Sequence, residues 1–431
     1  MLLLLFSCTP DPKSTLQPPD LPISSCGGSS YAWLPTEGMG TVVAAEAVSE
    51  WSLSRESIVA LAGLVGLEDS SVIQYGARVF RVRYTTQDRG LPTEATMILA
   101  LPDATGLQPP SLLYLHPTTG FEDFCAPSGR DITWAGIPLG LAGAGFAVAA
   151  PDYLGQNGFG AEASARHPFL AAEPTAVASL DSLRALWNYS EQTLGIRPDR
   201  ATVLLGASQG GAAALWSSRY AAAYLPEAQM KASVMTVPPL DLVAMADLSS
   251  KQLSVASMGV PFALLSLEDW YGLSESTEAV LVPGILPRLE TAMASECPKA
   301  EIPADIVSLD QIYTSAWQQG FTAETQEDWE PWRCMLEESS VGYQELLASS
   351  GVPTLLILGG ADDITLVEAQ RPAVSQLCAE GEQVLALECS GLGHSDTVRL
   401  TLDRQLSWIS ARLSGEALPE LCQGVETQAC D

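Results

Sequence analysis

"LLGASQGGAAALW", residues 204–216, begins as an apolar run, breaks at a turn of small residues and resumes as an alanine-rich stretch typical of a helix. Small side chains allow the backbone to pass close to itself in a sharp strand-to-helix turn, and here they are Gly206, Ala207, Gly210 and Gly211. Ser208 lies at the apex, where its hydroxyl would be exposed beside the N–H groups that open the helix. The stretch matches G-x-S-x-G, the nucleophile elbow, and so predicts Ser208 as a nucleophile. A capping serine in an ordinary turn is the alternative.

Short stretches with strand character recur along the chain. Residues 74–84 and 94–102 flank a turn-rich segment and are typical of an antiparallel pair. Six continuous apolar runs follow, as expected for strands covered on both faces: residues 111–116, 146–152, 202–208, 232–238, 354–360 and 384–390. Helical patterns lie between them at residues 173–188, 209–224, 365–379 and 396–413. This alternation predicts an α/β fold with an eight-stranded, mostly parallel sheet flanked by helices.

The interval between the sixth and seventh predicted strands is much longer than the others. Residues 238–352 contain amphipathic segments and many aromatic side chains but no convincing strand. A structureless loop of this length would be unusual in a compact domain. We therefore expect residues 238–352 to form a helical cap over the strand ends, inserted into a core made of residues 41–237 and 353–431.

A serine nucleophile needs a base that takes its proton and a carboxylate that orients the base. Three histidines are present, and His394 follows both Ser208 and the last predicted strand. The order Ser, Asp or Glu, His predicts His394 as the base. The acid should end the seventh strand, where Asp362 and Asp363 are neighbours; the spacing from Gly359 favours Asp362, whereas counting from Gly360 would give Asp363. The unused aspartate is expected to cap the following helix.

Attack on a carbonyl builds negative charge on oxygen, so two preset hydrogen-bond donors are required. The backbone N–H of Gln209, directly after the nucleophile, is the first candidate. The second should come from the loop after the third strand, in the stretch "LHPTTGFEDFCAPSG", where Thr118 is the best candidate. Thr118 and Gln209 are therefore the predicted oxyanion hole. No cluster of metal-ligand spacing is visible, so neither a metal nor another cofactor is expected.

The overall charge limits the kinds of partner. The chain has 51 Asp and Glu against 21 Lys and Arg, for a formal net charge of −30. Such a surface argues against nucleic acid or an anionic lipid surface as the main ligand. With 431 residues, 47% of them hydrophobic, the chain can bury a large core, and after its first residues no stretch is apolar for long enough to span a bilayer.

The first residues, "MLLLLFSCTPDPKS", form a short apolar run that ends at Cys8 and precedes polar, proline-rich sequence. This resembles the lipobox of bacterial lipoproteins, whose cysteine carries the lipid anchor, although the run is short and no basic residue precedes it. We expect residues 1–8 to be a lipoprotein-type signal segment, Cys8 the membrane anchor, and residues 9–40 a flexible tether and irregular arm. A hydrophobic chain terminus without this role is the alternative.

The number of cysteines is consistent with export. If Cys8 is acylated, eight remain for disulfides: Cys26, Cys125, Cys297, Cys334, Cys378, Cys389, Cys422 and Cys430. In a reducing compartment, nine scattered cysteines without C-x-x-C spacing would match neither a metal site nor a redox motif. From proximity to the predicted elements we expect the pairs Cys378–Cys389, Cys422–Cys430 and Cys297–Cys334, which leaves Cys26 to pair with Cys125.

Four segments resemble, in the same order, motifs of the secretory lipases, a group of exported α/β-hydrolases with a helical cap. They are "HPTTGFEDFCAPS", "APDYLG", "HPFLAAEPTAVASLDSLRAL" and "GASQGGAAALW". The resemblance runs from about residue 112 to residue 240 and resumes around Asp362 and His394. It implies an α/β-hydrolase fold and hydrolysis of carboxylic esters by Ser208, Asp362 and His394.

The expected function is that of a serine esterase or lipase that is exported and either attached to the cell envelope as a lipoprotein, with the outer membrane as one option, or secreted. Its expected partners are a small-molecule or lipid ester and, through Cys8, a membrane. Two other functions remain open: a non-catalytic envelope lipoprotein that uses the hydrolase fold for binding, and an acyltransferase or peptidase with the same three residues.

Overall fold

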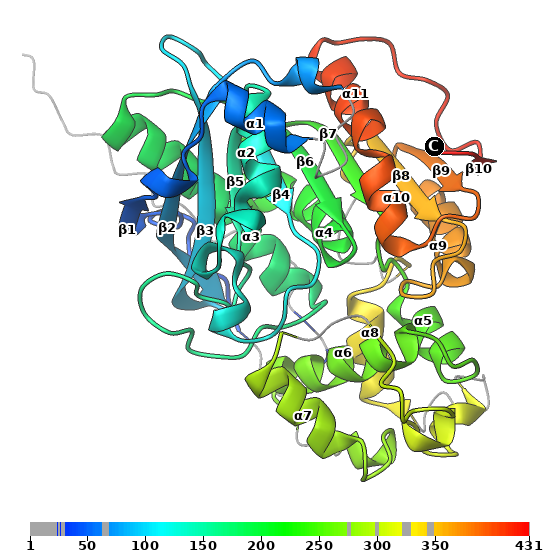
Figure 1. The fold of residues 1–431 in the computed structure, drawn as a ribbon. Coiled ribbons are helices and arrows are strands. Elements are labelled where there is room, and N and C mark those ends of the chain that lie inside the picture. The colour runs from blue at the N-terminus through cyan, green and yellow to red at the C-terminus, as the bar shows by residue number, and fades with distance from the viewer. Residues whose placement is uncertain are drawn as a thin grey trace, which may run out of the picture.

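A computed structural model describes residues 24, 26, 31–62, 69–273, 277–297, 301–320, 329–342 and 349–430. A ten-stranded sheet forms its centre (Figure 1). The strands are β1 (Val42–Ala47), β2 (Gly76–Asp88), β3 (Leu91–Asp103), β4 (Pro110–Leu115), β5 (Ala147–Pro151), β6 (Asp199–Ala207), β7 (Gln229–Thr236), β8 (Thr354–Gly359), β9 (Val384–Cys389) and β10 (Val425–Gln428).

The strand order across the sheet is β1-β2-β3-β5-β4-β6-β7-β8-β9-β10. Antiparallel pairing joins β1 to β2, β2 to β3 and β3 to β5, and all pairs from β5 to β10 are parallel. The predicted α/β fold is confirmed, but the sheet has ten strands rather than eight. The two additional strands, β1 and β10, lie at the sheet edges and have no buried residue. β10, with the sequence VETQ, also lacks the continuous apolar run of the strands that are covered on both faces.

The helices of the described chain are α1 (Arg55–Ala62), α2 (Gly136–Gly143), α3 (Ala172–Tyr189), α4 (Gln209–Tyr224), α5 (Leu242–Ser249), α6 (Ala256–Tyr271), α7 (Leu286–Ser295), α8 (Trp332–Glu338), α9 (Val367–Ala379), α10 (His394–Leu400) and α11 (Leu402–Leu413). The helix expected at residues 396–413 is thus two helices separated at Thr401. No helix of the described chain combines the length and apolar character needed to cross a membrane.

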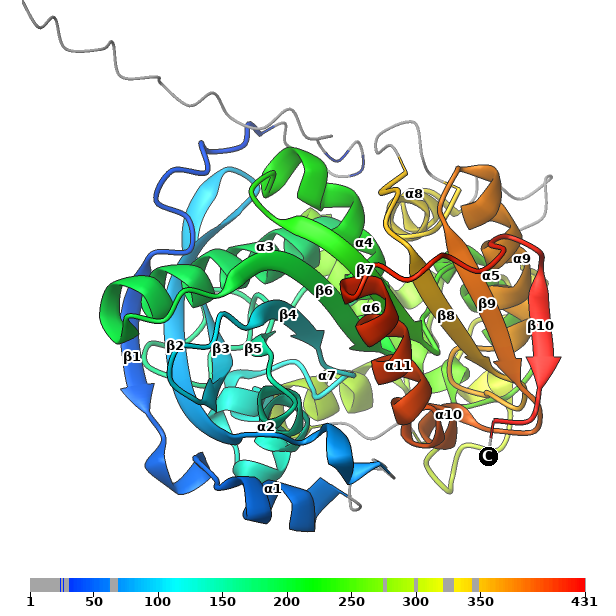
Figure 2. The same cartoon turned by 90° about the horizontal axis from the view of Figure 1, so that it is seen from above.

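Helices cover both faces of the sheet (Figure 2). Buried side chains of α3, α4 and α9 pack with one set of alternating strand residues, which includes Leu113 and Leu115. Side chains of α1, α2 and α11 pack with the opposite set, which includes Leu112 and Val203. This alternation is what a parallel strand buried on both faces requires.

Helices α5 to α8 form a separate hydrophobic cluster between β7 and β8 in the sequence, and we call residues 238–352 the cap. The cap lies beyond one end of the sheet in Figure 1. Its core contains Trp317, Trp329 and Trp332, all buried. Most of the aromatic residues that mark this region in the sequence therefore stabilise the cap itself.

The described residues of the expected tether and arm lie on the rest of the molecule. Trp33 is buried in the same hydrophobic cluster as α3 and α4, and the Leu34 N–H donates to Gln87 Oε1 at 2.7 Å. Residues 1–23, which include Cys8, fall outside the described residues. The packing of Trp33 means that at least this part of the arm belongs to the folded domain.

All eight cysteines of the described chain form disulfides, but none of the four predicted pairings is correct. The bonds are Cys26–Cys334, Cys125–Cys297, Cys378–Cys422 and Cys389–Cys430. The missed strand β10 explains two of the errors. Because α9 ends near the start of β9, Cys378 and Cys389 lie at opposite ends of that strand.

β10 runs parallel to β9. Cys422, which precedes β10, therefore lies near the start of β9, and Cys430, which follows β10, lies near the end of β9. Cys378 of α9 therefore bonds to Cys422, and Cys389 of β9 bonds to Cys430.

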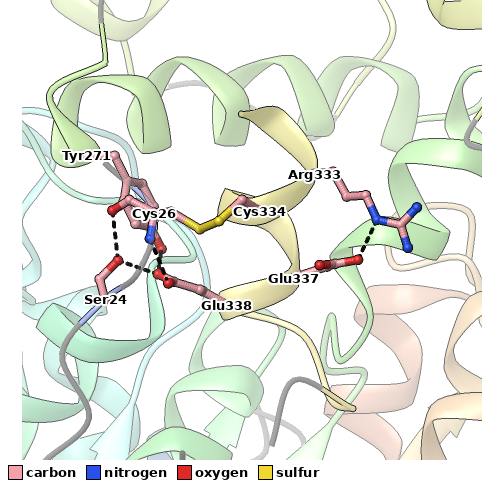
Figure 3. The surroundings of a disulfide bond; sticks show 7 residues. All are labelled: Ser24, Cys26, Tyr271, Arg333, Cys334, Glu337 and Glu338. Carbon is pink, nitrogen blue, oxygen red and sulfur yellow. Dashed lines mark hydrogen bonds and ion pairs between the residues drawn. A yellow bond between two sulfur atoms is a disulfide. The ribbon is translucent and has the colours of Figure 1, made fainter. Parts of the chain in front are cut away.

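The other two disulfides attach the cap to its surroundings. Cys125, in the loop after β4, bonds to Cys297, which follows α7, and Cys26 of the arm bonds to Cys334 of α8 (Figure 3). Beside the second bond, Glu338 of α8 accepts hydrogen bonds from the Cys26 N–H at 3.0 Å and the Tyr271 hydroxyl at 2.7 Å. The expected bond between Cys26 and Cys125 was wrong because both partners reach into the cap instead of toward each other.

Candidate active site

Ser208 occupies a strained turn between β6 and α4. Its backbone has φ 55° and ψ −124°, a conformation that side chains rarely adopt. The neighbouring glycines are required by close approach: a Cβ on Gly206 would collide with the Gly210 carbonyl oxygen, and one on Gly210 with the Leu115 carbonyl oxygen. The Ser208 N–H is held by the Thr236 carbonyl oxygen at 2.9 Å, so β7 helps to fix the turn.

Asp362 lies in the loop that follows β8, His394 is the first residue of α10 directly after the loop that follows β9, and the two side chains are in direct contact. His394 Nδ1 is 2.7 Å from Asp362 Oδ2. The two loops are themselves joined, because the Ala361 N–H donates to the Leu392 carbonyl oxygen at 2.9 Å. Nδ1 of His394 thus donates to the carboxylate, which leaves Nε2 as the ring nitrogen that can accept a proton.

The surroundings of Asp362 favour its charged form. Burial raises the pKa of this carboxyl, but the hydrogen bond and charge of His394 and the N–H groups of Thr365 and Ile364 outweigh burial and hold the pKa below its usual value. Asp363, by contrast, is exposed, and its backbone carbonyl rather than its side chain contacts the Ala256 N–H. Of the two candidate acids, the structure brings Asp362 to His394.

Two cavities meet at Ser208. The first, which we call the wide cavity, has a volume of about 270 Å³ and is lined by both Ser208 and His394, together with Phe121, Met258, Phe262 and Ser395. The second, the narrow pocket, has a volume of about 70 Å³ and is lined by Ser208, Gln209, Met245, Val260, Ala263 and Leu336. Ser208 and His394, which are far apart in the sequence, thus line the same cavity.

Both predicted oxyanion donors lie at the same place. Thr118 lines both cavities, and Gln209 lines the narrow pocket. As the first residue of α4, Gln209 has a backbone N–H without an acceptor inside the helix. The N-terminus of α4 also carries a partial positive charge, which favours a developing oxyanion beside Ser208.

A contact that sequence reasoning missed involves the side chain of Gln209. Its amide nitrogen lies 2.6 Å from His167 Nε2, and His167 Nδ1 lies 2.8 Å from the Leu154 carbonyl oxygen. Because Nδ1 must donate to that carbonyl, Nε2 accepts from Gln209. Burial lowers the pKa of His167 to about 4, so the ring stays neutral and keeps this role. No sequence signal links residues 167 and 209, since the contact arises only when α4 and the preceding loops pack together.

The strand order from β2 to β9, the elbow after β6, and the acidic and histidine loops after β8 and β9 define the α/β-hydrolase fold. The sequence profile of the family described as secretory lipase matches residues 138–265, which include Ser208. The resemblance seen in the sequence motifs is confirmed over that region, and it supports ester hydrolysis. No curated protein matches the chain.

Solved structures with this fold include an esterase and a lipase. The rice cell wall degrading esterase LipA from Xanthomonas oryzae is 19% identical, with a TM-score of 0.70 over 88% of this chain and 100% of that one. Candida antarctica lipase A in its closed state is 17% identical, with a TM-score of 0.69 over 91% of this chain and 86% of that one. At this level of identity, the similarity establishes the fold.

Proposed function

We propose that the chain is a serine hydrolase that cleaves carboxylic esters through an acyl-enzyme. The observation that carries the proposal is the 2.7 Å contact between His394 Nδ1 and Asp362 Oδ2, with His394 and the elbow residue Ser208 lining the same cavity. A nucleophile, a base and an acid in this order and arrangement are the elements of acyl transfer.

In the first half of the reaction, Ser208 Oγ attacks the ester carbonyl carbon while His394 Nε2 takes the hydroxyl proton. The charge on the carbonyl oxygen is stabilised by the backbone N–H groups of Thr118 and Gln209, each worth about 10²–10³ in rate. The Asp362 carboxylate accepts a hydrogen bond from Nδ1–H of the His394 imidazolium and stabilises its positive charge. His394 then gives its proton to the alcohol oxygen, the ester C–O bond breaks, and the acyl group remains on Ser208.

In the second half, His394 takes a proton from water, whose oxygen attacks the acyl carbon. The carboxylic acid leaves, and the proton returns to Ser208 Oγ. Every step uses groups of the chain and one water molecule, so the proposed reaction needs no added cofactor.

The direct test combines labelling and turnover. A fluorophosphonate probe should form a covalent adduct on Ser208, found by peptide mass mapping, and p-nitrophenyl esters should be hydrolysed. Ser208→Ala should lose both. Labelling without turnover of esters but with turnover of amides would indicate a peptidase, and absence of labelling and turnover in the native protein would leave a binding protein.

We also propose export and attachment to the envelope through Cys8. Four disulfides in the described chain support an oxidising compartment, and the resemblance of residues 1–8 to a lipobox supports the anchor.

A further inference from the structure

We propose that the two cavities at Ser208 divide the ester, so that the narrow pocket takes a short acyl group and the wide cavity takes a larger alcohol. This inference rests on the proposed function. It assigns a substrate class: esters of short acyl groups, of about four to six carbons, with bulkier alcohols.

The position of His394 determines which cavity takes the acyl group and which takes the alcohol. The proton that His394 carries must pass to the alcohol oxygen, so this oxygen has to lie beside the imidazole when the C–O bond breaks. His394 and its neighbour Ser395 line the wide cavity and do not line the narrow pocket. The alcohol therefore leaves through the wide cavity.

The narrow pocket has the properties of an acyl site. It opens at Ser208 and Gln209, the nucleophile and the oxyanion donor, and continues among the apolar side chains of Met245, Val260 and Leu336. An apolar lining with no titratable group suits a hydrocarbon chain and would leave the polar part of an alcohol without hydrogen-bond partners.

Helix α6 forms the wall between the two cavities. Met258 and Phe262, four residues apart on one side of the helix, face the wide cavity, whereas Val260 and Ala263 face the narrow pocket. Gly259 lines both, and a Cβ there would meet no atom within 4 Å. The cavities therefore diverge from a common point beside Ser208.

The volumes set the sizes of the two groups. At about 10–15 Å³ of such space for each water-sized atom, the 70 Å³ pocket holds about five non-hydrogen atoms and the 270 Å³ cavity about twenty. The wide cavity also adjoins a further hollow of about 520 Å³ between α6 and α7, with which it shares Met258 and Phe262. Space on the alcohol side is thus several times larger than on the acyl side.

Two isomeric esters test the assignment. Octyl butanoate and butyl octanoate have the same composition, but their short and long sides are exchanged. We expect kcat/KM for octyl butanoate to be at least about tenfold higher, because methylenes that exceed the capacity of a hydrophobic pocket lower kcat/KM by about tenfold or more. Rates are measured by titration of released acid below the solubility limit, and each is divided by the rate for ethyl acetate, which fits either cavity.

Matched variants test which cavity determines the preference for the acyl group. Met245→Ala enlarges the narrow pocket and should reduce the preference for octyl butanoate about tenfold, whereas the same substitution at Met258, in the wide cavity, should leave the acyl preference unchanged. Leu336→Ala provides a second enlargement of the narrow pocket if Met245→Ala does not fold. Thermal unfolding and fluorophosphonate labelling verify that each variant is folded and active.

Equal rates for the two esters, a preference for butyl octanoate, or a larger effect of Met258→Ala than of Met245→Ala on acyl preference would overturn the assignment while ester hydrolysis stands. If native protein hydrolysed neither isomer nor ethyl acetate, the proposed function itself would fail, and the assignment with it.

Discussion

Asp362 and Asp363 are neighbours in the chain with opposite surroundings. Asp362 is buried and accepts hydrogen bonds from Ile364, Thr365 and His394, while the side chain of Asp363 is exposed. The loop residue Asp362 thus serves both as partner of His394 and as an acceptor for the turn that leads to α9. This dual role explains why a carboxylate there stays ionised although it is buried.

The contrast gives a matched pair of substitutions. Asp362→Asn should lower kcat/KM for a p-nitrophenyl ester by about 10⁴, because an amide no longer stabilises the imidazolium or fixes its tautomer. Asp363→Asn should retain activity within about twofold. The measurement is steady-state kinetics on both variants, with circular dichroism as the check on folding; the reverse ranking would show that Asp363 is the acid.

Much of the candidate site could be predicted at the scale of residues because the signals are local. The glycines around Ser208 and the chain order of Ser208, Asp362 and His394 require no knowledge of packing. The His167–Gln209 contact and the two cavities could not be predicted in this way. They depend on how α4, α5 and α6 meet, and no spacing within one segment records that.

At the scale of elements, the arm connects α3 to α8 through two acidic residues, the buried Glu173 and the partly buried Glu338. The Tyr31 hydroxyl donates to Glu173 of α3, the Ser24 N–H donates to Tyr31 Oη at 3.1 Å, and Cys26 binds Glu338 of α8. Burial, with added repulsion from Asp88 and Glu338, raises the pKa of Glu173 from 4.5 to about 8, although the hydrogen bond from Tyr31 lowers it. Glu173 therefore holds a proton in the folded protein at neutral pH.

This proton makes stability depend on pH in a defined direction. Between pH 4.5 and about 8 the folded chain keeps a proton on Glu173 that the unfolded chain releases, so this contribution to stability is complete below pH 4.5 and falls as pH rises to 8. Glu173→Gln removes this pH dependence. We therefore expect the melting temperature of the variant, relative to that of the native protein, to increase by about 2–4 °C when the pH is raised from 5 to 8.

Calorimetry across this pH range measures the difference, and Glu162→Gln, on the exposed surface, is the control. A constant difference between native protein and Glu173→Gln at all pH values would contradict the protonation of Glu173.

The elements also show where sequence reasoning ends. Strands β4 to β9 have apolar runs that reveal them, whereas β10 has four residues, Val425–Gln428, that carry no such pattern. An edge strand of this kind is fixed by its pairing with β9 and by two disulfides rather than by its own composition. Missing it was enough to misassign the cysteines at both of its ends.

At the scale of the whole molecule, the net charge of −30 has to be reconciled with the proposed membrane anchor at Cys8. An acidic domain is repelled by an anionic lipid surface within about 8 Å at physiological salt. The several acyl chains of a lipoprotein, at about 0.8 kcal/mol per buried CH₂, exceed such repulsion. Anchoring through Cys8 is thus compatible with the acidic surface.

Cys8→Ser tests the anchor. The substitution should move the enzyme from the detergent-extracted membrane fraction to a soluble or unprocessed form, with unchanged hydrolysis of p-nitrophenyl esters, because residue 8 is remote in sequence from Ser208. Cell fractionation and intact mass measure this. Native protein that is already soluble and begins at Met1 would rule the anchor out.

The two cap disulfides restrict the way in which substrate can reach Ser208. The chain enters the cap after β7 and leaves it before β8. A cap joined to the core at these two connections alone could rotate about the line between them as a hinge. Cys125–Cys297 holds it to the loop after β4, and Cys26–Cys334 holds it to the arm on a further side. These two covalent links oppose a hinge motion of the described part of the cap about that line. On the proposed function, we therefore expect substrate to reach Ser208 through a passage between cap side chains, and we expect hydrolysis not to depend on an oil–water interface that opens a lid.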